Sequence, residues 1–123
     1  MIQCTCIVQQ GQSPDLHETE LRNRLTSFTT TAFDSDPHFN WVRIPPGNGF
    51  TAGKPSTSSV VSMVANRPLS AEHREQYLRE LVALWTSATS SSVDEIVAVI
   101  ADPANAKETQ NAAIHLQHRA EHP

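Results

Sequence analysis

The 123-residue sequence contains no long hydrophobic run and no cluster of basic residues. No window approaches the roughly 18 consecutive apolar residues that a membrane-spanning helix needs. Nine Lys and Arg residues are scattered among 13 Asp and Glu residues, which gives a formal net charge of −4. This distribution argues against a role at nucleic acid or at a membrane surface. No basic stretch followed by an apolar segment opens the chain, so we expect a soluble, cytoplasmic protein.

Cysteine is scarce as well, and the two that are present, Cys4 and Cys6, lie in an apolar stretch. On an extended strand they point to the same face, too close in sequence for an easy disulfide. A C-x-C metal site would need further ligands, and none has suitable spacing nearby. We interpret both residues as core thiols of a reducing compartment.

The motifs of cofactor-dependent and serine-nucleophile enzymes are missing too. The sequence has no glycine-rich phosphate-binding loop and no glycine-flanked serine elbow. His115, His118 and His122 have a spacing that occurs among metal ligands, but their weakly patterned surroundings favour a solvent-exposed tail. We therefore expect neither a cofactor nor a metal.

Hydrophobic residues make up only 38% of the chain, which is little for a self-sufficient monomer of this size. The length fits one domain with one core. We infer that a partner subunit supplies part of the burial.

The residues that are present describe a strand–helix–strand order. Residues 2–9 are rich in β-branched and apolar residues, as in a strand. Ser13-Pro14 predicts a helix start, with Ser as N-cap and Pro at the first helical position. Apolar residues at helical spacing follow, the DSDP stretch at 34–37 ends the helix, and residues 39–44 form a second strand.

The same order then occurs a second time. Residues 59–66 predict a strand, and Ser70 is placed to cap a second helix. The serine-rich stretch at 90–92 ends that helix, and residues 95–101 predict a fourth strand.

These elements predict an α/β (α+β) fold of two consecutive βαβ units, at 1–46 and 59–102. A connecting loop at 47–58 joins the units, and a tail at 103–123 follows. Parallel pairing within each unit, with right-handed crossovers, places both helices on one face of a four-stranded sheet. With no third long helix to cover the other face, the most economical cover is another copy of the chain. We therefore expect a homo-oligomer.

This organisation resembles the tautomerase superfamily, and within it the malonate semialdehyde decarboxylase and cis-3-chloroacrylic acid dehalogenase groups. Three stretches carry the resemblance: Thr31-Ala32-Phe33 through Pro37 to Trp41, Val60 to Ser70, and Ser92 to Val97. The resemblance as a whole spans about the first 105 residues. The resemblance implies a tautomerase/MIF-like fold, a homotrimer and a small oxo- or unsaturated carboxylate ligand. An active member would be an isomerase or tautomerase, or a lyase of the decarboxylase or hydratase type.

The resemblance also implies chemistry that this sequence cannot perform in the usual way. The family's catalytic group is the secondary amine of an amino-terminal proline, which acts as general base or as cationic acid. Here Ile2 aligns with that proline, and because methionine removal requires a small second residue, we expect Met1 to be retained. What remains is a primary amine displaced by one residue, which leaves a weak-base or Schiff-base role open.

Other family positions are also mostly substituted. The decarboxylase's pair of carboxylate-binding arginines falls on Arg67 and Leu69, and the dehalogenase's pair on Asn66 and Leu69. The dehalogenase's first-helix histidine falls near Thr29, and its last-strand tyrosine near Val99. Most of the polar catalytic and binding residues that the resemblance implies are therefore missing.

A few polar residues remain as candidates. The decarboxylase's catalytic aspartate falls near Phe39, where a small alignment shift brings in Asp36. Asp36 and His38 can serve as acid or base, or as ordinary turn residues. Arg67 lies at the turn from a strand to a helix, where its guanidinium can bind a carboxylate in a bidentate manner. The alternative is that Arg67 is an ordinary surface or interface arginine. Arg43 has a similar claim from the second strand.

Two functions from different classes follow from this reading. The first is a divergent tautomerase-type enzyme that uses the Met1 amine or a loop side chain, and the second is a non-catalytic oligomeric ligand binder or structural homologue. The candidate catalytic residues are Met1, Ile2, Asp36 and His38, and the candidate substrate-binding residues are Arg67, Asn66, Thr29 and Arg43.

Overall fold

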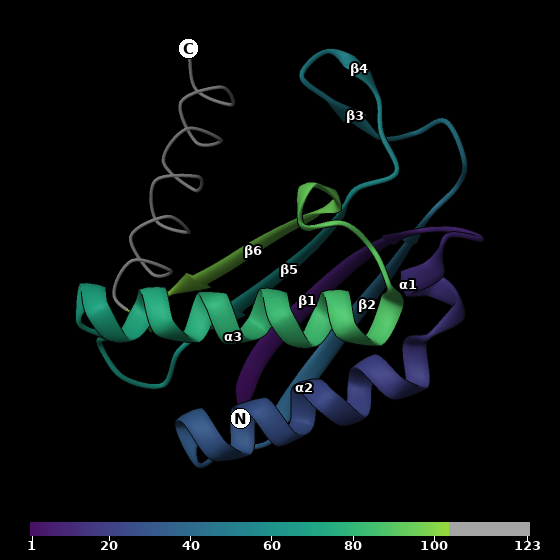
Figure 1. Cartoon of the computed structure of the whole chain (residues 1–123). Coiled ribbons are helices and arrows are strands. Elements are labelled where there is room, and N and C mark those ends of the chain that lie inside the picture. Colours follow the sequence, from purple (N-terminus) through teal and green to yellow (C-terminus); the bar gives the residue numbers. More distant parts are fainter. Residues whose placement is uncertain (104–123) are drawn as a thin grey trace, which may run out of the picture.

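Two strand–helix–strand units build a four-stranded sheet with two long helices on one face (Figure 1), in a computed structural model that describes residues 1–103. The sheet has the strand order β2-β1-β5-β6. The first unit comprises β1 (Ile2–Gln9), α1 (Ser13–Leu16), α2 (Glu18–Phe33) and β2 (Pro37–Ile44). The second comprises β5 (Ser59–Val64), α3 (Ala71–Thr89), the 3₁₀ turn η1 (Val93–Glu95) and β6 (Ile96–Ala101).

The strand directions confirm the predicted pairing. β1 runs parallel to β2 and β5 runs parallel to β6, so each unit contains one parallel pair. The two units meet through β1 and β5, which are antiparallel, with Gln3 opposite Val64. The predicted α+β architecture with both helices on one sheet face is therefore present.

The core fills the space between the sheet and the two helices. Alternate residues of β1, from Ile2 to Val8, point toward the helices and are at most 1% exposed. Such alternation is what a strand with one buried face requires. The main buried side chains of this layer are Ile2, Cys4, Cys6 and Val8 of β1, Val61 and Met63 of β5, Leu21 and Leu25 of α2, and Leu81 and Trp85 of α3.

The opposite face of the sheet carries a mixture of apolar and polar residues. No helix among residues 1–103 lies over it (Figure 1). On β6, Val97 is 51% exposed and Val99 is 42% exposed. We call this surface the open sheet face, and no helix or strand among residues 1–103 covers its apolar residues.

The two predicted helix starts have different outcomes. Ser70 caps α3 as predicted, because its side chain accepts a hydrogen bond from the His73 amide. The prediction for Ser13 is wrong: Gln12 holds the N-cap position of α1, and the Ser13 hydroxyl donates to the Thr89 carbonyl at the end of α3. The expected continuous first helix is also interrupted at His17, which separates α1 from α2.

The helix ends follow the sequence signals. α2 ends at Phe33 and α3 at Thr89, and each is followed by a residue in the left-handed conformation, Asp34 (φ 50°) and Ser90 (φ 58°). In each case the amide of that residue donates to a carbonyl of the preceding turn. The two units thus end their helices in the same way, with a polar residue where glycine is commonest.

The connecting segment 47–58 is more ordered than a plain loop. It contains a two-stranded hairpin of β3 (Phe50–Thr51) and β4 (Lys54–Pro55), which projects above the sheet (Figure 1). Ala52 and Gly53 form its turn, both with positive φ, as a tight hairpin turn requires. The predicted tail lies, beyond Pro103, outside the described residues.

Among the described residues, no helix is both long and apolar enough to cross a membrane.

Candidate functional site

The predicted site residues gather mainly at one end of the sheet, where β1 begins. The Ile2 amide donates to the Asp36 carbonyl at 2.9 Å, which places the loop before β2 on one side. The antiparallel register of Gln3 with Val64 brings Asn66 and Arg67 to the other side. Met1 therefore lies between these two loops, beside the end of α2 (Figure 1).

Ile2 is an ordinary strand residue in this arrangement. Its side chain is fully buried, and its backbone nitrogen is an amide that is hydrogen-bonded to Asp36. Met1 is 77% exposed. Ile2 thus contributes packing, and its nitrogen is not a free amine when Met1 precedes it.

Arg67 is held against the end of α2. Its Nη2 atom donates to the Ala32 carbonyl at 3.1 Å and approaches the Tyr77 hydroxyl at 3.5 Å. Its Cζ atom lies 5.5 Å from the centre of the Phe33 ring, a cation–π distance. A cation at this place also suits the negative end of the helix dipole. The guanidinium remains exposed although it is held in place.

Asn66 binds the same helix end. Its Nδ2 atom donates to the Phe33 carbonyl at 2.8 Å, and its Oδ1 atom accepts from Arg67 at 3.4 Å. The last carbonyls of a helix have no partner within the helix, so these two side chains supply partners for two of them. Both residues therefore have a structural role at the site.

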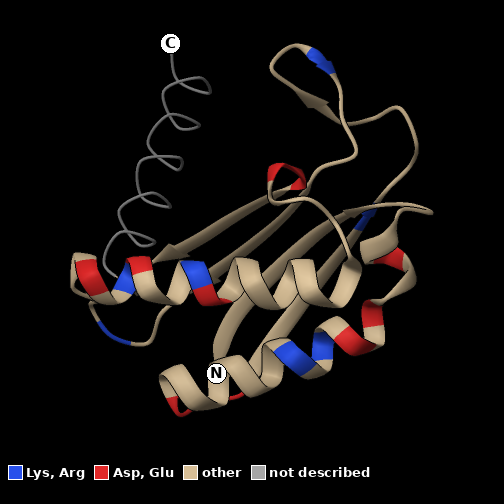
Figure 2. Ribbon diagram, viewed as in Figure 1, with Lys and Arg blue, Asp and Glu red and all other residues tan. Residues whose placement is uncertain are grey.

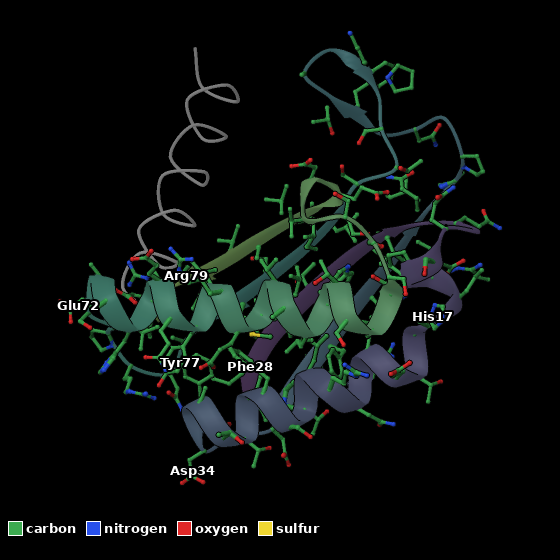
Figure 3. All side chains as sticks on the ribbon, viewed as in Figure 1. His17, Phe28, Asp34, Glu72, Tyr77 and Arg79 are labelled. Carbon is green, nitrogen blue, oxygen red and sulfur yellow. The ribbon has the colours of Figure 1, made fainter. Side chains whose placement is uncertain are left out.

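An aromatic cluster packs next to the Arg67 side chain. Phe28 of α2 and Tyr77 of α3 meet edge to face between the helices, with ring centres 6.2 Å apart (Figure 3). Phe33 lies 5.5 Å from Tyr77 in a similar arrangement. Sequence reasoning missed Phe33 and Tyr77 as neighbours of Arg67. The only available signal was that Phe33 is the last residue of the predicted helix.

Asp36 and His38 lie at the same end of the sheet. Asp36 is exposed in the loop before β2, and its carboxylate accepts from the Thr30 hydroxyl at 3.5 Å. His38 pairs with Gln3 in the sheet and is exposed on the open sheet face. The site therefore carries acidic charge on the side of α2 and basic charge in the loop between β5 and α3 (Figure 2).

Thr29, unlike the exposed candidates, lies in the protein interior. It is fully buried in α2, and its hydroxyl donates to the Thr26 carbonyl at 3.2 Å. Within one chain the structure gives it no surface on which a ligand can bind.

Arg43 lies at the opposite end of the sheet from Met1. It pairs with Val8, which is six residues beyond Ile2 on β1, or roughly 20 Å along the strand at about 3.3 Å per residue. Its Nε atom lies 2.7 Å from Asp15 Oδ1, and its Nη2 atom donates to Oδ2 at 3.0 Å. The Arg43 guanidinium and the Gly11 amide hold the pKa of the Asp15 carboxyl below its ordinary value. The structure thus does not bring Arg43 together with the other candidates.

The two cysteines behave as buried thiols. Their sulfur atoms are 3.9 Å apart, and both residues are at most 1% exposed. The hydrogen bond with Cys4, together with burial, raises the pKa of the Cys6 thiol, which disfavours the thiolate that nucleophiles and metal ligands need. Within residues 1–103, no group of three or more His, Cys, Asp or Glu side chains is arranged to hold a metal ion.

The sequence matches no protein-family model, and no curated protein matches it. The fold is similar to solved structures. The native structure of Ps01740 is 19% identical, with a TM-score of 0.73 over 81% of this chain and 92% of that chain. N1, a member of the cis-3-chloroacrylic acid dehalogenase family, is 9% identical, with a TM-score of 0.71 over 81% and 73%. A wild-type fused 4-OT, described as a symmetric trimer, is 14% identical, with a TM-score of 0.67 over 81% and 84%.

Proposed function

Since the chain has the fold of the tautomerase superfamily, we propose that it acts on or binds a small oxo- or unsaturated carboxylate at the amino-terminal end of its sheet. The observation that carries the proposal is the placement of the exposed Arg67 guanidinium at the same sheet end as Met1. The dehalogenase family of N1 is named for an unsaturated carboxylic acid, which supports this ligand class.

Arg67 is suited to hold the carboxylate. The Ala32 carbonyl, the Tyr77 hydroxyl and the Phe33 ring restrain its side chain, so less conformational entropy is lost when a ligand binds. A guanidinium has five N–H donors, and these contacts use only part of them. The partners of Arg67 in the described part of the chain are uncharged, so they leave its positive charge available for a carboxylate.

Proton transfer at this site would be atypical for the superfamily. The Ile2 nitrogen is a hydrogen-bonded amide and cannot act as a base. The candidates are the Met1 amine, the Asp36 carboxylate and the His38 imidazole, which all lie at this end of the sheet. Any activity would be that of an isomerase, or of a lyase of the decarboxylase or hydratase type.

We also propose a homotrimeric assembly. The open sheet face exposes apolar residues such as Val97 and Val99, which a partner subunit would bury. The fused 4-OT structure of similar fold is a trimer, and this supports the subunit number.

A second function is favoured by a specific observation. The proline position is a buried strand residue, and Leu69 stands where the family has a second arginine. Both changes suit a non-catalytic ligand-binding or structural homologue.

Ligand titration tests the binding proposal. Calorimetry with phenylpyruvate compares the parent with Arg67→Met, which removes the charge and retains much of the side-chain volume. We expect Arg67→Met to weaken binding at least about 10-fold, or roughly 1.4 kcal/mol. Arg24→Met is the matched control, because it makes the same substitution at an arginine of α2 that pairs with Glu20 and is not a candidate for the site. Equal weakening in both variants, or no binding by the parent, would contradict the proposal.

Activity assays separate the two functions. Keto–enol conversion of phenylpyruvate and loss of CO₂ from malonate semialdehyde are measured for the parent and for Ile2→Pro, in which Met1 can be removed. Intact mass establishes the first residue of each, and circular dichroism verifies the fold. Activity in the parent supports atypical catalysis. Activity gained only by Ile2→Pro supports an intact pocket that lacks its base, which favours the second function.

A further inference from the structure

An apolar groove of about 800 Å³ lies between α3 and the edge strand β6, away from the proposed site. Leu78 and Val82 of α3, Val93 of η1 and Ala98 of β6 form much of its lining. Val93 is 65% exposed, so an occupant of the groove can bury much of its apolar surface. The groove is therefore at the β6 edge of the molecule, on the side of the sheet that carries the helices, and not on the open sheet face.

The end of the described chain is anchored at this groove. β6 ends at Ala101, and the Asp102 carboxylate then accepts from the Leu69 amide at 3.2 Å and forms an ion pair with Arg74. Arg74 itself lines the groove. The segment that follows Pro103 therefore starts at the groove, near the beginning of α3.

We propose that the carboxy-terminal segment 104–123 of the same chain binds in this groove. The segment has 20 residues, and its largest apolar side chains are Ile114 and Leu116. Ile114 is eleven positions beyond Pro103, a distance of about 16 Å along a helix and about 36 Å along an extended chain. Val82 is eight helical residues beyond Arg74, roughly 12 Å along α3, so Ile114 can reach it in either conformation.

Tethering favours this segment over a free partner. A covalently linked segment that starts beside its binding site has an effective concentration in the millimolar range. Arg74, which lines the groove, also has an unpaired donor: its Nε atom is buried and bonds no acceptor among residues 1–103. Backbone carbonyls or the side chains of residues such as Asn105 can supply that acceptor. The proposal is independent of the carboxylate site, which lies where β1 begins.

Methyl NMR of the full chain, with labelled Ile, Leu and Val, tests the proposal. In the parent we expect nuclear Overhauser effects between the methyl groups of Ile114 or Leu116 and those of Leu78, Val82 or Val93. The double variant Ile114→Asp and Leu116→Asp should lose these effects and shift the groove resonances. The control Gln110→Asp and Gln117→Asp adds the same charge at polar positions and should retain them. The core methyls of Leu25 report that each variant is folded.

Two results would overturn the proposal. One is the absence of these effects in the parent, which would leave the groove to another occupant. The other comes from a mixture of labelled and unlabelled copies, in which effects found only between different copies would show that a second chain's segment fills the groove.

Discussion

At the scale of single residues, two arginines of the same predicted role differ in what they contact. Arg43 is paired bidentately with Asp15, whose side chain is only 6% exposed, so its charge is compensated within the chain. Among residues 1–103, Arg67 contacts neutral acceptors and an aromatic ring. The sequence singled out both residues. It gave no sign that Arg43 pairs with Asp15, because Asp15 precedes Arg43 by 28 positions and reaches it only through the fold.

The Asp15–Arg43 pair leads to a prediction about stability and pH. Asp15→Asn leaves weaker hydrogen bonds to Arg43 and Gly11, and we expect a loss of about 1–3 kcal/mol in unfolding free energy at pH 7. The folded-state pKa of Asp15 is lowered, so its stabilisation is fully present above the usual value of 3.8 and is lost as pH falls through the folded pKa. Urea unfolding at pH 7 and near pH 2.5 measures both.

The matched control for this prediction is Glu75→Gln. Glu75 pairs with Arg79 on the surface of α3, where both side chains are more than 60% exposed (65% and 78%). Such a pair contributes roughly 0–1 kcal/mol, so this variant should stay close to the parent. An Asp15→Asn loss of equal size at both pH values would show that the effect comes from packing rather than charge.

At the scale of secondary-structure elements, the two units use the same strand and helix order but different helix starts. Ser70 is a true N-cap, and its hydroxyl accepts from an amide three residues ahead. Ser13 instead donates to Thr89, which belongs to the other unit. A local sequence pattern identifies a residue that can cap. It does not determine whether a tertiary partner takes the hydroxyl first.

The two serines should therefore respond differently to the same substitutions. Ser70→Ala should lose about 1 kcal/mol, and Ser70→Asp should retain most of the stability, because a carboxylate also accepts from the His73 amide. Ser13→Ala should also lose about 1 kcal/mol, but Ser13→Asp should not restore it, because a carboxylate cannot donate to the Thr89 carbonyl. Thermal or urea unfolding of the four variants checks this. Recovery by Ser13→Asp would indicate that Ser13 caps α1 after all.

At the scale of the whole molecule, the sheet divides the chain into a packed side and an open side. One face is covered by α2 and α3, whereas no described element covers the other (Figure 1). This open face mixes apolar β6 residues with polar residues such as His38 and Asn40, and these side chains are exposed. Assembly through this face would complete the burial that the low apolar content of the sequence leaves unfinished.

Charge placed on the open sheet face should therefore weaken assembly. The double variant Val97→Asp and Val99→Asp would bury carboxylates in the interface, and we expect subunit dissociation constants to rise at least about 100-fold, or roughly 2.8 kcal/mol. Sedimentation velocity over a range of concentrations measures the shift toward monomer. Leu16→Asp is the control, because Leu16 is 72% exposed on α1, away from this face. A monomeric parent, or unchanged assembly in the double variant, would contradict the proposed trimer.

The sequence by itself determined the order and approximate bounds of the four long strands and the second helix, but not the hairpin of β3 and β4 or the break at His17 in the first helix. These features depend on local periodicity, on the Ser70 cap and on the stop signals at Asp34 and Ser90, so they can be read from neighbouring residues. Only the tertiary structure decided the partners of the candidate residues. Arg67 and Ala32 are 35 residues apart, and Ser13 and Thr89 are 76 apart. Such contacts depend on how helices and strands pack, which no local pattern encodes.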